Sequence, residues 1–392
     1  MGHRTPIYLD AHATTPVDER VLAAMLPYFT DRFGNAASKQ HVYGWEAEAA
    51  VEGARSEVAT LVGASAREII FTSGATESIN LALKGVAEGS NAGGRELITA
   101  ATEHRAVLDT CRTLERRGWT VRILPVDRYG RIALEALSAA LTERTVLVSV
   151  MLANNEIGTL QDLRAISRLC RARGVLLHSD ATQAVGNIPV DVNALGVDLM
   201  SFSAHKMYGP KGAGALYVRE TSPRIRMLAQ VDGGGHERGL RSGTSNVPAI
   251  VGFGAAARIA REYLAHEPSR VQDLRDRLVA LMEASLDDVI VNGHPEFRLP
   301  NNANLTFPGT RADGLMMDMK EIAVSTGSAC SSSAPEPSHV LRAIGVPPEL
   351  ARATLRFGLG RFTTDEDVVC AAGRVADVVQ LQRERRTAGV RA

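Results

Sequence analysis

The order of hydrophobic and polar residues predicts helices and strands that alternate as far as about residue 260. Ala47, Val51, Ala54, Val58 and Leu61 recur at steps of three and four, which places them on one face of a helix. Short apolar runs predict strands at 68–71, 96–101, 146–151, 175–178 and 198–202. Helical patterns fall between these runs. Such alternation indicates an α/β protein with a mostly parallel sheet covered by helices.

The pattern changes in the last part of the chain. Helical stretches come first, then an apolar run at 304–307, and then a Gly- and Ser-rich stretch around 325–334. A final helical face carries Val368, Val375 and Val379. This order predicts a second, smaller domain of the α+β type.

Composition and charge narrow the class of protein. The 392 residues are 45% hydrophobic and 22% charged, which is typical of a globular domain with its own core. Lys+Arg and Asp+Glu both number 44, so the charge balance gives no reason to expect nucleic acid or an anionic membrane as a direct partner. No apolar run approaches the ~20 residues that a membrane helix needs. The first six residues lack an apolar core, so we expect no secretory signal.

The cysteines indicate a reducing compartment. Four cysteines, at positions 111, 170, 330 and 370, are too few and too far apart for a disulfide framework. None of them has the close spacing of a zinc site, and we predict no metal. Cys111 and Cys170 fall on apolar helical faces and are expected in the core. The predicted location is therefore the cytoplasm.

Two charged residues follow neighbouring predicted strands. Lys206 comes just after the strand at 198–202, and Asp180 ends the strand before it. Ligands of parallel sheets collect at the carboxyl ends of strands, so both groups are expected at one edge of the sheet. A lysine there can form a Schiff base with an aldehyde cofactor, and an acid there can keep a pyridinium nitrogen protonated. Read singly, each has a plainer alternative: a solvated loop lysine and a helix-capping aspartate.

Further polar groups follow other strands. The small residues at 72–77 leave backbone N–H groups that can bind an anion at a helix N-terminus, although a plain N-cap gives the same pattern. The segment lacks the further glycines of a dinucleotide fingerprint, which disfavours an NAD enzyme. His104 can stack on a planar cofactor or move protons, and a hydrogen-bonded core histidine is its alternative. Arg356, on a strand-like segment, suits a two-pronged grip on a carboxylate or a structural ion pair.

Cys330 differs from the other cysteines. It lies in the polar stretch Ser325 to Ser333 rather than on an apolar face. A thiol in such a loop is a plausible nucleophile, and an incidental loop cysteine is the alternative.

Taken in order along the chain, these clusters resemble the cysteine desulfurases of the NifS and IscS type, which are PLP-dependent members of the class-V aminotransferase family. The similarity runs nearly end to end, and its most specific stretches are 72–78, 102–104, 154–158, 205–206 with 208–212, 233–244 and 327–330. The resemblance implies the fold type I of aspartate-aminotransferase-like enzymes, with a mostly parallel seven-stranded sheet, and a homodimer. In this division residues 16–260 form the large domain, and residues 1–15 and 261–392 form the small domain.

The resemblance also implies a role for each matching residue toward pyridoxal 5'-phosphate (PLP). Lys206 would be the Schiff-base lysine, Asp180 would pair with the pyridinium nitrogen and Gln183 would bind the ring hydroxyl. His104 would stack on the ring and move protons. The remaining cofactor and substrate positions form two groups. The phosphate would be held by Ala75, Thr76, Ser203, His205 and, from the other subunit, Thr244. Asn155 would contact the cofactor and, with Arg356 and Asn35, the substrate carboxylate.

The reaction implied is the conversion of L-cysteine to L-alanine, with the sulfur kept as a persulfide on Cys330 for a sulfur-acceptor protein. The acceptor stays open between an iron–sulfur scaffold and a thiolation protein. A selenocysteine lyase or a related class-V aminotransferase is the main alternative. A non-catalytic sulfur-relay scaffold is disfavoured because the whole catalytic set is intact.

Three departures from the family pattern stand out. Ala204 replaces a glycine that is common in relatives, and a methyl group should be tolerated there. Ala11 and His12 lie where relatives vary, and the sequence assigns them no role. The chain ends at Ala392, and we expect it to lack the C-terminal extension with which some members dock their scaffold.

Overall fold

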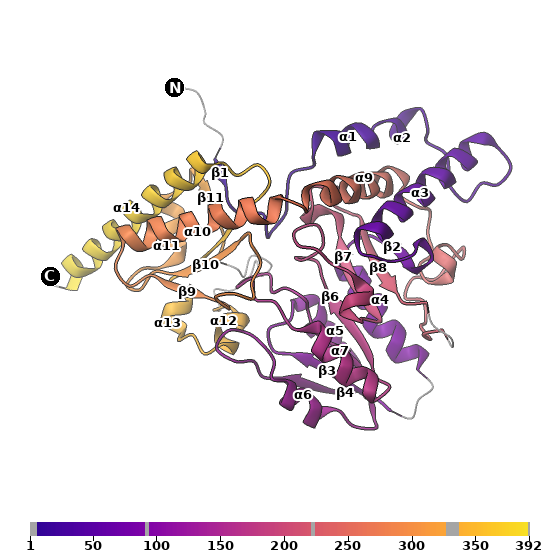
Figure 1. Cartoon of the computed structure of the whole chain (residues 1–392), viewed down its shortest axis with the longest axis horizontal. Helices are drawn as coiled ribbons and strands as arrows, with labels where there is room; N and C mark the ends of the chain where they lie inside the picture. Colours follow the sequence, from indigo (N-terminus) through magenta and orange to yellow (C-terminus); the bar gives the residue numbers. More distant parts are fainter. Residues whose placement is uncertain (1–5, 91–93, 221–223, 327–336, 391–392) are drawn as a thin grey trace.

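The computed structural model describes residues 6–90, 94–220, 224–326 and 337–390, with side chains as far as residue 387. Figure 1 shows a larger lobe built around strands β2 to β8 and a smaller lobe that contains α10, α11 and α14. Cys330 lies outside the described residues.

The larger lobe is built on a sheet that has seven strands within the described ranges, in the order β2-β8-β7-β6-β5-β3-β4. Only β8 in this sheet runs antiparallel to its neighbours, so the predicted fold class is confirmed. The five predicted strands are present as β2 (Ile69–Thr72), β3 (Glu96–Ala100), β5 (Thr145–Ser149), β6 (Leu176–Asp180) and β7 (Leu199–Ser203). The other two, β4 (Thr120–Leu124) and β8 (Gly214–Val218), were not predicted. Strand β4 is a mostly exposed edge strand, so it carries little hydrophobic signal.

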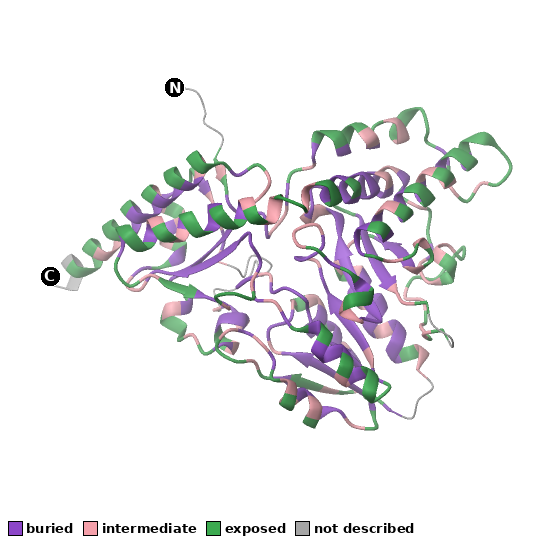
Figure 2. Cartoon of the chain, in the orientation of Figure 1, coloured by how far each residue is buried: buried purple, intermediate pink, exposed green. Residues whose placement is uncertain are grey.

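Helices cover both faces of this sheet, which explains the apolar runs in its strands. Successive residues of β2 enter different cores: Phe71 packs with α3 and α9, and Ile70 packs with α4 and α5. Figure 2 shows the central strands buried. The helices of this lobe are α1 (Glu19–Met25), α2 (Pro27–Thr30), α3 (Val42–Leu61), α4 (Ala75–Gly89), α5 (Arg105–Arg116), α6 (Leu134–Ala140), α7 (Leu163–Ala172), α8 (Val192–Leu195) and α9 (Val247–Tyr263), with short 3-10 turns at Ala66–Glu68, Ala204–Lys206 and Glu237–Gly239.

The smaller lobe has a core of its own, to which Leu9, just after the N-terminal strand, contributes. Its antiparallel sheet has the order β12-β10-β9, and β1 pairs with β11 beside it. Its elements are β1 (Ile7–Tyr8), α10 (Glu267–Ser285), β9 (Ile290–Asn292), β10 (Asn302–Thr306), α11 (Ala312–Asp318), β11 (Ile322–Ala323), α12 (His339–Ala343), α13 (Pro348–Ala351), β12 (Thr354–Gly358) and α14 (Asp365–Val390). The division at residues 15 and 260 stays a prediction.

The register of β6 and β7 positions the two charged residues predicted from the sequence. These strands are parallel neighbours, and Asp180 is the last residue of β6. The chain leaves β7 at Ser203 and reaches Lys206 through the 3-10 turn Ala204–Lys206. Both groups therefore leave the same edge of the sheet. Across the described ranges, none of the helices has the length and apolar character needed to cross a membrane.

Candidate active site

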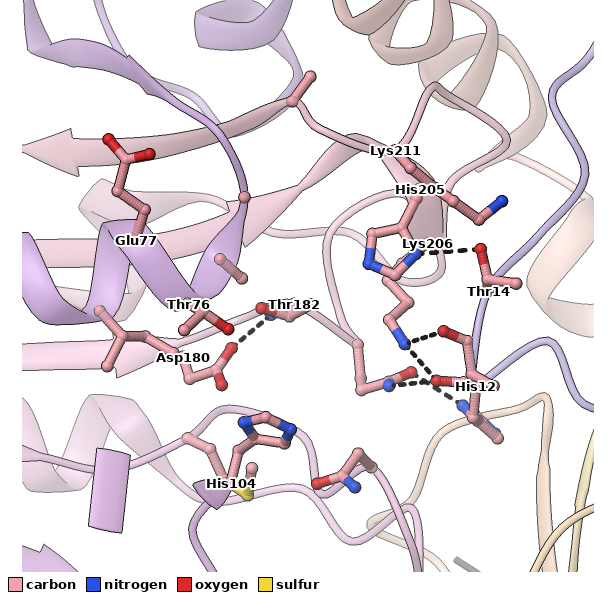
Figure 3. Close-up of a pocket in the computed structure, with 18 of the residues that line it drawn as sticks. His12, Thr14, Thr76, Glu77, His104, Asp180, Thr182, His205, Lys206 and Lys211 are labelled. Carbon is pink, nitrogen blue, oxygen red and sulfur yellow. Dashed lines mark hydrogen bonds between the residues drawn. The ribbon is translucent and has the colours of Figure 1, made fainter. Parts of the chain in front are cut away.

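A cavity of about 630 Å³ lies at the carboxyl edge of the sheet, within the size range of small-molecule sites. It collects residues from strand ends, from the start of α4 and from the segment that follows β1 (Figure 3). Of the predicted residues, the cavity is lined by Ala75, Thr76, His104, Asn155, Asp180, Gln183, His205, Lys206 and Arg356. The structure therefore brings nine predicted positions together from distant parts of the sequence.

The side chain of Lys206 points into this cavity. Its Nζ donates to the backbone carbonyl of His12, and to that of Ala13 at 2.7 Å. Figure 3 shows the amine among the labelled residues of the cavity, opposite Asp180 and His104. The two carbonyls hold the amine at the cavity wall, where it can bind an aldehyde.

Asp180 is 5% exposed, and its carboxylate is fixed by its own turn. Its Oδ1 accepts a hydrogen bond of 2.9 Å from the backbone N–H of Thr182. This arrangement leaves the carboxylate facing the cavity, as the labelled side chain in Figure 3 shows.

The start of α4 forms another wall of the cavity. Thr72 Oγ1 contacts Ser78 Oγ at 2.7 Å across the turn that joins β2 to α4. Gly214 allows this turn to lie against β8, because a Cβ at this glycine would be 2.5 Å from Cα of Gly74. The first N–H groups of a helix have no acceptor within it, so those of Ala75 and Thr76 are suited to bind an anion.

His104 enters the cavity from the N-cap of α5. Its Nδ1 accepts a hydrogen bond of 3.1 Å from the backbone N–H of Ala106. In the neutral ring the proton therefore lies on Nε2. The backbone thus fixes both the orientation and the tautomer of this histidine.

Asn155 and Arg356 meet at the boundary of the two lobes. Arg356 Nη1 donates to the backbone oxygen of Asn155 at 2.8 Å, and Nη2 donates to Asp10 Oδ1 at 2.8 Å. The guanidinium therefore takes part in a structural ion pair as well as lining the cavity. Its buried Nε has no hydrogen-bond partner within the described ranges.

His205 is neutral in this site. Burial, and then the neighbouring charges of Lys206 and Lys211, lower the pKa of its imidazole from 6.5 to about 4. Its Nδ1 lies 3.1 Å from Thr14 Oγ1. A neutral imidazole can donate one hydrogen bond to an anion while it keeps this contact.

Three predicted residues do not line the cavity of this chain. Asn35 is exposed, and its Oδ1 accepts from the backbone N–H of Ala37 at 2.9 Å. Thr244 is also exposed. Ser203 is buried at the end of β7, where it pairs with Gly214. The roles assigned to these three residues stay predictions.

Several residues of the cavity had no role in the sequence analysis. They are His12, Thr14, Thr182 and Lys211. Thr14 lies in a stretch that matches the family and His12 comes just before it, but a match in sequence does not tell which side chains face a cavity. His12 is the most buried of the four, with 2% of its surface exposed.

Comparison with known proteins places this site in a family. The model of the Aminotransferase class-V family matches residues 7–370. A protein named cysteine desulfurase IscS from Anaeromyxobacter sp. (strain Fw109-5) is 56% identical over 381 residues, which cover 97% of this chain and 94% of that protein. The chain belongs to the class-V aminotransferase family, among the cysteine desulfurases.

Solved structures of this family have the same architecture. A NifS-like protein superposes with a TM-score of 0.89 at 38% sequence identity and covers 96% of this chain and 100% of that one. A structure described as SspA in complex with cysteine has a TM-score of 0.80 at 35% identity, over 91% of this chain and 99% of that chain. The family and fold predicted for this cysteine desulfurase from its sequence are thereby confirmed.

The residues of the cavity fit the PLP that this desulfurase family uses. The hydroxyl oxygens of Thr182 and Ser203 are buried without a hydrogen-bond partner in the described part of the chain, although buried polar groups are normally paired. Ser203 pairs with Gly214, which lies against the turn at the start of α4. The hydroxyl of Ser203 thus lies beside the start of α4, where backbone N–H groups can also bind a phosphate.

Proposed function

We propose that this enzyme converts L-cysteine to L-alanine and keeps the released sulfur as a persulfide on Cys330. The chain is a cysteine desulfurase that depends on PLP. The convergence of Lys206 and Asp180 on one cavity, from the ends of neighbouring strands, is the observation that carries the assignment of residues. PLP, when bound, supplies a protonated ring that withdraws electrons from the α-carbon of an amino acid.

The protein would hold the cofactor by five kinds of contact. Lys206 would bind it covalently through Nζ, and Asp180 would pair with the ring nitrogen and keep it protonated. Gln183 would donate to the ring oxygen, and His104 would stack on the ring. The phosphate would lie at the start of α4, where backbone N–H groups and the positive end of the helix favour an anion. Its proposed ligands are Ala75, Thr76, Ser203, His205 and Thr244 of the partner subunit.

The substrate would be oriented by its carboxylate. Arg356 can add this carboxylate to its contact with Asp10, because a guanidinium has five N–H donors and Nε is still without a partner in the described ranges. Asn155 lies beside it and would contact both cofactor and substrate. This grip would hold the α-carbon near the amine of Lys206, which can accept and return a proton. His104 is the second group placed to move protons.

The residues on either side of the segment that contains Cys330 are anchored, on one side to Arg356 of the cavity and on the other to the buried residues Glu156 and Glu103. Before the segment, Ser325 pairs with Arg356, whose N–H donates to the Ser325 carbonyl at 2.6 Å. After it, Ser338 donates to the buried carboxylate of Glu156, and His339 Nε2 lies 2.9 Å from the carbonyl of Glu103. These anchors support Cys330 as the residue that meets the substrate sulfur.

The sulfur step is balanced without an external oxidant. The Cys330 thiolate attacks the sulfur of the bound cysteine, the C–S bond breaks and an S–S bond forms. The electrons of the C–S bond stay with the former β-carbon, which gains a proton as alanine is formed. Burial raises the pKa of the Cys111 and Cys170 thiols to about 12, so both are poor nucleophiles.

A homodimer is supported by an exposed apolar surface on one side of the larger lobe. We call it the N-terminal patch, and it consists of Leu22, Leu26, Phe29, Phe33, Val42, Tyr43 and Trp45, each at least 47% exposed. It covers α1, α2 and the start of α3, which Figure 1 shows projecting from the rest of the lobe. Exposed apolar patches of this kind mark protein interfaces. We propose that a second copy of the chain covers it.

The sulfur would pass from Cys330 to an acceptor protein. We propose that this acceptor is a scaffold of iron–sulfur assembly or a protein of a thiolation pathway. A persulfide on Cys330 suits either one, because its outer sulfur can be attacked by a partner thiolate.

Mass spectrometry tests this function directly. The PLP-loaded enzyme is exposed briefly to cysteine without reductant, and alanine is measured in parallel. We expect one added sulfur on the peptide that contains Cys330, with alanine formed. Cys370→Ala is the matched control, because Cys370 is an exposed thiol on α14, outside the stretch that contains Cys330. This control should gain sulfur like the unmodified enzyme, and Cys330→Ala should not. Sustained alanine formation by Cys330→Ala would disprove the persulfide mechanism.

A further inference from the structure

His12 and Gln183 are joined by two hydrogen bonds. The His12 ring Nδ1 lies 2.9 Å from Gln183 Oε1, and Gln183 Nε2 donates to the backbone oxygen of His12 at 3.0 Å. Both side chains are at most 5% exposed, and both line the cavity. The two residues are 171 positions apart in the sequence, so this pairing exists only in the folded protein.

The geometry fixes the direction of each bond. A backbone carbonyl can only accept, so the Gln183 atom that faces it is the NH₂ group. Oε1 then faces the His12 ring, and Nδ1 must carry the proton. His12 is neutral, because burial lowers its pKa to about 3, as do the neighbouring charges of Arg356 and Lys206. The neutral ring thus donates from Nδ1 to Gln183.

The position of His12 is itself fixed by the backbone around it. Ala11 N–H donates to the Gly358 carbonyl at 3.0 Å, and Thr15 N–H donates to the His205 carbonyl at 3.0 Å. The ring lies against Gly358, where an added Cβ would be 2.8 Å from His12 Cδ2. The segment between β1 and α1 therefore holds the imidazole rigidly against the small lobe.

We propose that His12 is a positioning residue: its carbonyl selects the NH₂ end of the Gln183 amide, and its ring Nδ1–H holds Oε1 at the other end, so that one N–H is left for the ring oxygen of PLP. The NH₂ group of Gln183 has two protons, and the His12 carbonyl takes one of them. With the amide reversed, its oxygen would face the carbonyl of His12, and no donor would face the cofactor. The proposal rests on the proposed role of Gln183, and it gives a function to a position at which the family resemblance assigns none.

The consequence is visible in the titration of the bound cofactor. A donor to the ring oxygen stabilises negative charge there and withdraws electron density from the nitrogen that Lys206 contributes. The proton on that nitrogen is then lost at a lower pH. Loss of the donor should raise the midpoint of the visible absorbance change by about half to one pH unit, the value of one neutral hydrogen bond.

The experiment is a pH titration of the visible spectrum of the purified holoenzyme and its variants. His12→Phe keeps a ring and removes the donor, whereas His12→Asn keeps an N–H near the place of Nδ1. We expect His12→Phe to raise the midpoint and His12→Asn to restore it toward that of the unmodified enzyme. Circular dichroism and cofactor content verify folding, and His12→Ala serves as the second donor-free variant if the Phe ring disrupts packing.

A double-mutant cycle separates this proposal from the role of Gln183. Gln183→Ala should raise the midpoint by itself, and adding His12→Phe to it should have no further effect. If Gln183→Ala shifts the midpoint but no donor-free His12 variant does, or if His12→Phe has its full effect in the Gln183→Ala background, the role of His12 is wrong. If Gln183→Ala has no effect, the assignment of Gln183 to PLP fails, and this proposal fails with it.

Discussion

Arg356 and Asp10 form a buried ion pair between the ends of the chain, with Nη2 of Arg356 2.8 Å from Oδ1 of Asp10. Their side chains are only 3% and 17% exposed. Arg356 also lines the cavity, so the structural ion pair is shown and the contact with the substrate carboxylate stays a proposal. The two roles can be separated by changing one partner at a time.

Arg356→Lys keeps the charge and removes the two-pronged guanidinium. We expect the KM for cysteine to rise by about tenfold or more, because an ammonium cannot replace a bidentate contact. Asp10→Asn leaves the guanidinium in place without its anion. Its main effect should be a loss of about 3 kcal/mol in the free energy of unfolding, the cost of a broken buried pair. Steady-state kinetics and urea unfolding of both variants test whether substrate binding and stability are lost separately. Equal losses of stability with an unchanged KM would show that Arg356 is structural alone.

Gly214→Ala tests the contact that holds the turn at the start of α4. The new Cβ would lie 2.5 Å from the Cα of Gly74, and this neighbour is backbone that cannot rotate away. We expect a loss of about 1–3 kcal/mol in stability and weaker PLP binding, because the displaced turn carries the proposed phosphate donors. Gly373→Ala is the matched control, since nothing lies within 4 Å of its new Cβ. It should stabilise α14 by up to ~1 kcal/mol, the difference in helix propensity. Thermal unfolding measures stability, and a PLP titration measures cofactor affinity. Equal stability and equal affinity of the two variants would show that the close approach of Gly214 to Gly74 does not matter.

The N-terminal patch can be tested by oligomeric state. Replacing both Phe29 and Phe33 by Ser should convert a dimer to a monomer, since aromatic residues contribute most to such interfaces. Met317→Ser is the control, because Met317 is 71% exposed but lies on α11 of the small lobe. Light scattering gives the masses. An unchanged mass for the double variant would place the interface elsewhere.

His178 should make the fold less stable in acid. It lies between Ser149 Oγ at 2.8 Å and Ser201 Oγ at 2.9 Å, and burial lowers its pKa from 6.5 to about 3. Between these values the unfolded chain binds a proton that the folded chain does not. Stability is therefore complete above about pH 6.5 and falls toward pH 3, by about 1.4 kcal/mol per pH unit for this group.

His178→Gln removes this titration. We expect its unfolding free energy, measured in urea at several pH values from 4 to 7, to fall less steeply in acid than that of the unmodified protein. The unfolding free energy of the variant can be lower at every pH, because the two serines lose well-placed partners. The slope of the unfolding free energy against pH is therefore the quantity to compare. An unchanged slope would show that His178 binds its proton equally well in the folded chain.

Much of the candidate site that lines the cavity could be predicted from the sequence, because its elements carry strong local signals. The strands that lead to Asp180 and Lys206 begin with apolar residues and are almost entirely buried, so the polar residues at their ends stand out. Parallel pairing then requires these two residues to share an edge. The helix that starts at Ala75 was predicted in the same way, from small residues between a strand and an apolar face.

Other features of the structure left no local signal in the sequence. The edge strand β4 was missed because most of its residues are exposed. The second contact of Arg356, with Asp10, joins residues 346 positions apart, and no local pattern reports such a pair.

The sequence by itself determined the fold class, the family and the residues able to do the chemistry, because periodicity and motifs are properties of neighbouring residues. Only the tertiary structure decided how those residues are held. His12 is the clearest case: it follows a short strand, carries no pattern of its own and had no assigned role. It becomes a partner of Gln183 and Lys206 because the chain start packs against β12 and the turn after β7. Such contacts depend on which distant backbones approach each other, and that is fixed only when the two cores are packed.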